Sequence, residues 1–159
     1  MNGMATENVL DIAAFMLKEK SPITTMKLQK LLYYCQAWSL VWDGKPLFKE
    51  PIEAWANGPV VRKLYDIHKG KYEIEFSFMQ EYGNPDNLAD FQKETVKAVL
   101  HYYGNKSPQW LIDITHMENP WREARNGLVD RERGHEEIHL ASLAEYYEKV
   151  YNEGIEIRA

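Results

Sequence analysis

Residues 135–139 read His-Glu-Glu-Ile-His and match the pattern H-E-x-x-H. On a helix, histidines four positions apart lie on one face and can bind Zn²⁺, while the intervening glutamate acts as the general base of a peptidase. A zinc peptidase that uses His135, Glu136 and His139 is therefore one hypothesis for this chain.

The neighbourhood of this pattern argues against a metal site. Arg133 and Gly134 precede it in place of an apolar helical run, and the nearest helix start signal, a capping box that begins at Ser142, follows it. No histidine comes later in the chain to act as a third ligand, so Glu145 or Glu148 would have to do so. We expect no metal here and keep the peptidase as the less favoured alternative.

The remaining nucleophiles and histidines form no catalytic pattern. Cys35 is the only cysteine and falls on the apolar face of a predicted helix, where a thiol behaves as a small hydrophobic group. His68, His101 and His116 are dispersed, and no glycine-rich phosphate loop, G-x-S-x-G or C-x-x-C occurs. We expect no catalytic residue, no cofactor and no enzymatic activity.

Eight basic side chains lie on, or just after, the helices predicted at about 6–18, 25–42 and Pro59 to about His68. They are Lys18, Lys20, Lys27, Lys30, Arg62, Lys63, Lys69 and Lys71. On neighbouring helices they would form one positive face, either solvated or able to dock an acidic protein or a nucleic acid. A nucleic-acid-binding domain is usually basic, whereas this chain has a formal net charge of −5. A nucleic-acid-binding regulator is therefore an alternative and not the main hypothesis.

The length of 159 residues suits one domain, which we expect over residues 1–159 with its core at about 6–152. The composition is that of a globular protein, with 45% hydrophobic and 13% aromatic residues. We find neither a signal-peptide pattern nor an apolar run long enough to span a membrane. A cytoplasmic protein without membrane contact is expected.

The elements that would position these residues are organised around residues 25–42, TMKLQKLLYYCQAWSLVW. Apolar residues recur there at helical spacing and cover most of the circumference, which predicts a helix enclosed by other elements. Thr24 or Thr25 should cap it. The predicted fold is mainly α: a compact single-domain helical bundle around this aromatic-rich helix.

The rest of the chain predicts shorter elements around this helix. A small β-hairpin is expected over about 46–56, with a helix from Pro59 to about His68 after it. The other predicted helices cover about 6–18, 86–103, 107–116, 119–125 and 142–152, capped in the first two cases by Thr6 and Asp86. The pattern leaves the structure of 71–85 and 128–137 open.

Several motifs resemble those of the SocA-like Panacea antitoxin domain, also called the phage-associated GepA-like family. They are residues 27–34 (KLQKLLYY), 44–48 (GKPLF), 53–61 (EAWANGPVV), 64–65 (LY), 111–116 (LIDITH), 120–121 (PW), 124–125 (AR), Ile138 and 146–147 (YY). The resemblance covers about residues 8–150, and the order and spacing of the motifs make it specific.

This resemblance implies a toxin–antitoxin role. Panacea domains neutralise unrelated protein toxins by protein–protein contact, and one branch of the family delivers its toxin to a cellular protease. The expected partner is a toxin encoded by a neighbouring gene, with a protease as a second partner; self-association stays open. Some relatives belong to prophages without an assigned partner, so a prophage-encoded regulator is the alternative.

The resemblance also divides the residues into scaffold and surface. We expect the shared motif residues to be mostly structural: Lys27, Leu31, Tyr34, Trp38, Trp55, Gly58, Pro59, Val60, Tyr65, Pro120, Trp121 and Arg125. The partner is expected on side chains that the motifs leave free, namely Arg62, Lys63, Lys69, Lys71 and Tyr72.

Overall fold

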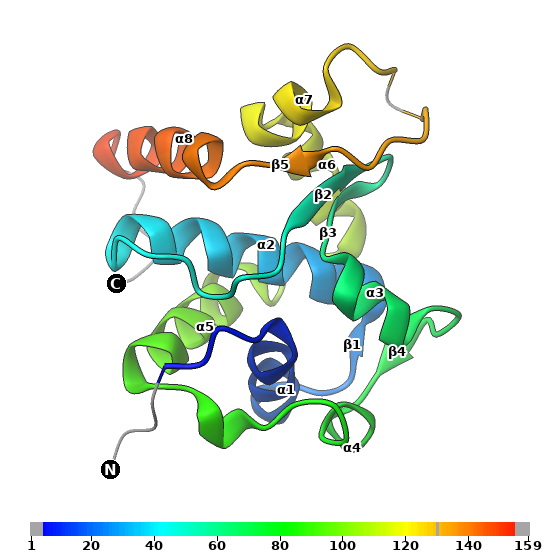
Figure 1. Cartoon of the computed structure of the whole chain (residues 1–159), viewed down its shortest axis with the longest axis vertical. Helices are drawn as coiled ribbons and strands as arrows, with labels where there is room; N and C mark the ends of the chain where they lie inside the picture. Colours follow the sequence, from blue (N-terminus) through cyan, green and yellow to red (C-terminus); the bar gives the residue numbers. More distant parts are fainter. Residues whose placement is uncertain (1–4, 130, 155–159) are drawn as a thin grey trace.

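The helix over Thr25–Trp42 (α2) forms where the sequence pattern places it and runs through the middle of the molecule (Figure 1). The computed structural model describes residues 5–129 and 131–154. Thr24 caps α2, because its hydroxyl accepts the backbone N–H of Lys27 at 3.2 Å. Every side chain from Leu28 to Ser39 is buried, so α2 is enclosed on all sides as its composition predicts.

Helices surround α2 on several sides, and the mainly α class is confirmed. The elements that pack on α2 are α1 (Val9–Glu19), α5 (Asp90–Tyr103), α6 (Pro108–Met117) and α8 (Leu140–Asn152). In Figure 1, α8 lies along one side of α2, with α5 and α1 on the opposite side. Two shorter helices are α3 (Arg62–His68) and α7 (Asn119–Arg125). No helix in the described ranges is both long and apolar enough to cross a bilayer.

Helices α1, α5 and α8 begin at residues other than those that the sequence predicts. Asn8 rather than Thr6 caps α1: its side chain accepts the backbone N–H of Leu10 at 2.9 Å. Asp86 lies in a short 3₁₀ turn, η1 (Pro85–Asn87), so α5 starts only at Asp90. The last helix begins before its predicted cap Ser142, which is a residue of α8.

A three-stranded antiparallel sheet covers one end of α2. Its order is β3 (Gly58–Val60), β2 (Ile52–Trp55), β5 (Glu137–Ile138), with Glu53 opposite Val60 on one side and Glu137 on the other. A small hairpin is therefore present, but it spans residues 52–60, not 46–56. Pro59 belongs to its second strand, which is why α3 starts at Arg62 and not at Pro59.

The predicted first strand of the hairpin is instead a loop fixed to α2 by Gln36. The side-chain oxygen of Gln36 accepts the backbone N–H of Leu47 at 2.6 Å, and its amide donates to the carbonyl of Phe48 at 2.9 Å. Because the backbone N–H of Leu47 and the carbonyl of Phe48 are bonded to Gln36, they do not pair with a neighbouring strand. The buried Gln36 side chain replaces strand pairing here.

Residues 71–85 contain regular structure. A second, two-stranded sheet pairs β1 (Ile23–Thr24) with β4 (Glu73–Ile74), and α4 (Phe76–Met79) follows. This segment is further held where the buried carboxylate of Asp11 accepts the backbone N–H of Asn84 at 2.8 Å.

The core encloses one carboxyl group. Glu118, between α6 and α7, accepts hydrogen bonds from three hydroxyl groups: those of Tyr33 at 3.2 Å, Tyr34 at 3.4 Å and Tyr147 at 2.6 Å. Burial raises the pKa of Glu118 to about 7, against the opposing effect of these hydrogen bonds. Glu118 thus connects α2 and α8 through the hydrogen bonds that it accepts from the three tyrosines.

Candidate functional site

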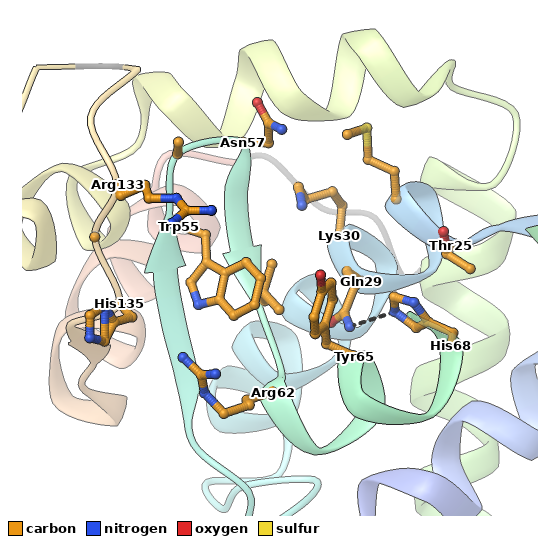
Figure 2. A pocket seen from close by; sticks show the side chains of 14 residues that line it. Thr25, Gln29, Lys30, Trp55, Asn57, Arg62, Tyr65, His68, Arg133 and His135 are labelled. Atoms are coloured by element: carbon orange, nitrogen blue, oxygen red, sulfur yellow. Dashed lines mark hydrogen bonds between the residues drawn. The ribbon is translucent and has the colours of Figure 1, made fainter. Parts of the chain in front are cut away.

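A cleft of about 560 Å³ opens between the first turns of α2, the hairpin and α3. We call it the basic cleft. Its lining residues are Thr25, Met26, Gln29, Lys30, Trp55, Ala56, Asn57, Val60, Arg62, Tyr65, His68, Arg133, Gly134 and His135. Figure 2 shows Lys30 and Gln29 on α2, Trp55 on the hairpin, and Arg133 and His135 on a separate segment at one side.

Lys30 forms part of the floor. Its side chain is buried, and its ammonium group donates to the carbonyl of Pro59 at 3.1 Å. Burial lowers the pKa of Lys30 to about 7. Buried lysines are usually paired with an acid, but no ion pair to Lys30 occurs among the described residues.

Gly58 makes room for the Lys30 side chain. A Cβ at this position would stand 2.6 Å from Cε of Lys30 and 3.0 Å from the hydroxyl of Thr115. The backbone of Gly58 also has φ of +114°, which residues with a side chain rarely adopt. Glycine is thus needed here both for the turn of the strand and for the approach of Lys30.

Gln29 and His68 form the polar corner of the cleft. The Gln29 side chain accepts the backbone N–H of Val61 at 2.8 Å, and its nitrogen lies 3.0 Å from Nε2 of His68 (Figure 2). Burial, and to a lesser degree the charge of Lys30, lowers the pKa of His68. The structure buries His68 against Gln29.

Aromatic rings form one wall. The rings of Trp55 and Tyr65 meet edge to face with centroids 4.8 Å apart, and the Arg62 guanidinium lies 5.2 Å from the Trp55 ring centroid. Arg62 also donates two hydrogen bonds to Glu53, at 2.9 and 3.1 Å, and this pairing lowers the pKa of Glu53 against the effect of burial. The shared motif residues Trp55 and Tyr65 therefore line the cleft, in addition to any structural role.

Arg125 holds the segment that carries Arg133 and His135. Its buried guanidinium donates to the carbonyls of Ala54 at 3.3 Å and Val129 at 2.8 Å, and also to that of Glu132. The backbone of Ala54 in turn donates to the Glu136 carbonyl at 2.8 Å. These bonds place the 131–136 segment along the hairpin, at the edge of the basic cleft.

The helical geometry that the zinc-peptidase hypothesis requires is not present at residues 135–139. Residues 135–139 run extended through β5 and not along a helix, so His135 and His139 do not share a helical face. Ile138 between them is buried in the sheet, while Glu136 and both histidines are exposed. Within residues 5–129 and 131–154, no group of three possible metal ligands comes together.

The charge of the basic cleft has one sign. Lys30, Arg62, Arg133, His68 and His135 line it, and no aspartate or glutamate does. Glu53 offsets the charge of Arg62. Arg133 is exposed and forms no ion pair with any residue that the structure describes.

The other surface residues expected to bind a partner lie outside the cleft. Lys63 pairs with the buried Glu50 at 3.0 Å, and Lys71 lies over the ring of Phe78. Lys69 and Tyr72 are exposed. Of the expected set, only Arg62 lines the basic cleft.

The eight basic side chains do not all reach a common solvated face. The ammonium groups of Lys20 and Lys27 both donate to the carbonyl of Gly104, at the C-terminal end of α5, where cations are favoured. Lys30 is enclosed by the hairpin. Lys20 and Lys27 are thus held at one place and Lys30 at another, apart from Lys63 and Lys71.

Other motif residues belong to the core. Leu31, Tyr34 and Trp38 are buried in α2. Trp121 stacks on His116 at 4.1 Å between centroids and donates from its indole N–H to the carbonyl of Trp55 at 2.8 Å. It therefore joins α6, α7 and the hairpin, so that the motif residues around the cleft are coupled to those of the core.

The comparisons with known proteins agree with the motifs. The family model for the antitoxin SocA-like Panacea domain matches residues 28–122. The chain belongs to this family. The match includes the floor of the basic cleft, the hairpin and α3, but not the segment at 133–135.

Similarity to a related antitoxin supports the same family. Antitoxin SocA of Caulobacter vibrioides (strain NA1000 / CB15N) is 31% identical to this chain over 117 residues, or 67% of the chain. The alignment spans 62% of that relative, less than two thirds of its length. No solved structure matches this member of the Panacea family significantly.

Proposed function

We propose that this chain is a non-enzymatic antitoxin that acts in the cytoplasm and neutralises a protein toxin, encoded by a neighbouring gene, through direct binding. The observation that carries the proposal is the match of the SocA-like Panacea antitoxin model across residues 28–122. The 31% identity to Antitoxin SocA supports it.

The described structure supports binding better than catalysis. Cys35, the only thiol, is fully buried, and burial raises its pKa, so it is not an accessible thiolate. The basic cleft instead combines an aromatic wall with cationic groups, which suits recognition of a partner's surface.

Co-expression with the adjacent gene tests this function. We expect the neighbouring product alone to stop growth, co-expression of this chain to restore it, and the two proteins to purify together. A harmless neighbour with no complex would contradict the proposal. A matched plasmid that carries the chain with an early stop codon controls for the cost of expression.

Delivery of the toxin to a protease is a distinct mechanism within the same proposal. It requires the half-life of the toxin to fall when this chain is present, whereas occlusion leaves the half-life unchanged or longer. A pulse-chase measurement of the toxin, with and without the chain, separates these two mechanisms.

A further inference from the structure

We propose that the basic cleft receives a protruding acidic segment of the toxin, in which one carboxylate pairs with Lys30 and a neighbouring apolar side chain packs on Trp55 and Tyr65. This inference rests on the proposed antitoxin function and adds the site and the chemistry of the partner to it.

The volume of the cleft sets the kind of occupant. At about 560 Å³ it is within the range that binds a small molecule or a few side chains, and it is too small for a folded element to enter whole. A turn or an extended segment that projects from the toxin surface can place two or three side chains in such a space.

The charges of the cleft set the chemistry. Lys30, Arg62 and Arg133 line the space with two histidines and without an acidic lining residue. Arg62 is already paired with Glu53, and Lys30 is buried with a pKa of about 7. We therefore expect an incoming carboxylate to meet the exposed Arg133 at the rim and to pair with Lys30 at the floor, where the carboxylate favours the charged form of the amine. Complementary charge across an interface favours the correct partner and disfavours others.

Lys30 has hydrogen-bonding capacity that the described residues do not use. An ammonium group carries three N–H donors, and the structure gives this one a single acceptor, the carbonyl of Pro59. Burial of an amino group without an acid destabilises the fold relative to an apolar residue of the same shape, and Gly58 must stay without a side chain to admit it. A carboxylate from the partner supplies both the missing acceptors and the missing charge.

The aromatic wall adds apolar area beside this charge. Trp55 and Tyr65 lie on the hairpin and α3 (Figure 2). Met26, Ala56 and Val60 also line the cleft. An acidic residue next to an aromatic or aliphatic one would therefore fill the cleft better than a run of acidic residues alone.

The test measures the affinity of the full chain for the purified product of the neighbouring gene by isothermal titration calorimetry. Lys30→Met keeps the aliphatic length and removes the charge, and Arg133→Met does the same on the exposed rim, where folding is not at risk. We expect losses of at least about tenfold for Lys30→Met and about threefold to tenfold for Arg133→Met. The control Lys149→Met, exposed on α8 and outside both the cleft and the expected partner surface, should stay within about twofold of the wild type.

A double-mutant cycle identifies the partner group. Single Asp→Asn and Glu→Gln substitutions across the toxin should reveal one carboxylate whose loss is not additive with that of Lys30→Met. Thermal unfolding of Lys30→Met checks that the variant is folded.

The two proposals fail in different ways. If the wild-type chain does not bind the neighbouring product, the proposed function fails. If the wild type binds and both cleft variants retain its affinity, or if Lys149→Met loses as much as they do, the function stands and the cleft inference is overturned.

Discussion

Gly58 and Lys30 are packed so closely that the backbone of the hairpin encloses the lysine side chain: any Cβ at Gly58 would lie 2.6 Å from Cε of Lys30. A strand residue and a helix residue 28 positions apart in the sequence thus determine together whether the floor of the basic cleft exists. The hairpin thus encloses Lys30 in addition to burying Ile52, Ala54 and Val60 in the core.

The substitution Gly58→Ala should destabilise the domain and reduce toxin binding. The added methyl group meets Lys30 in a backbone conformation with φ of +114°, so we expect a loss of about 2–4 kcal/mol in the free energy of unfolding. Urea denaturation followed by circular dichroism measures it. Gly70→Ala is the matched control, because Gly70 has φ of +87° with open space around it and should lose only the conformational part, about 1 kcal/mol. Equal losses for both variants would contradict the packing argument.

Glu118 should make stability depend on pH. Burial raises its folded-state pKa from 4.5 to about 7, so between these values the folded state keeps a proton that the unfolded state has released. Stability from this group is therefore present below about pH 4.5 and is lost as the pH rises towards about 7, by about 3 kcal/mol in total. Urea denaturation at intervals from pH 4.5 to 8 gives the dependence.

The variant Glu118→Gln isolates this contribution. It keeps an oxygen acceptor for the three tyrosines but does not titrate, so its stability should fall less between pH 4.5 and 7 than that of the wild type. Glu123→Gln, an exposed position on α7, should follow the wild type. Identical pH profiles for wild type and Glu118→Gln would show that Glu118 is not protonated in the folded protein.

Arg125 should control the order of the segment that carries Arg133. In Arg125→Met the carbonyls of Ala54 and Val129 lose their donor, and we expect a loss of about 2–4 kcal/mol in the free energy of unfolding. Hydrogen exchange at residues 131–136 should be faster in this variant than in the wild type, and exchange in α2 should change less. Arg122→Met, exposed on the same helix, should leave both quantities unchanged. Protection of 131–136 that persists in Arg125→Met would show that β5 pairing alone orders the segment.

The extended course of residues 135–139 gives a prediction about metal content. Chelator-free protein should contain less than about a tenth of an equivalent of zinc, because histidines on either side of a short strand do not form the helical H-E-x-x-H site. Elemental analysis by mass spectrometry measures it, and His135→Ala should give the same value. A full equivalent of zinc that disappears in His135→Ala would contradict the structure of this segment.

The parts of the fold that local sequence decides were predictable. Apolar spacing located α2, and Ser107 before Pro108 and Asn119 before Pro120 located the starts of α6 and α7. The capping side chains of α2 and α6, Thr24 and Ser107, and the proline in the first turn of α7 belong to the helix starts themselves, so the signal is local.

The errors came from groups that find their partners far along the chain. Pro59 favours the first turn of a helix by its own conformation, but pairing with Ala54 places it in a strand. Gln36 takes the backbone groups of Leu47 and Phe48 that an isolated strand would offer to another strand.

The candidate site was predictable only in part. Trp55 and Tyr65 are in recognisable motifs, and Arg62 lies between those motifs. Nothing in the local pattern shows that Lys30 is buried, since a lysine in the early turns of a helix is usually exposed. The clue was indirect: Gly58-Pro59 follows an aromatic strand in the motif, and the close approach of a backbone to another group commonly requires such a glycine. Arg133 and His135 reach the cleft only because Arg125 and β5 bring them there.

The most direct test of the account is growth of cells that express the neighbouring gene with and without this chain. We expect the neighbouring product to arrest growth and the chain to restore it, with the Lys149→Met control as effective as the wild type and Lys30→Met less effective at equal protein levels. A neighbouring product that remains fully toxic in the presence of folded, abundant wild-type chain would contradict the central claim that this domain is its antitoxin.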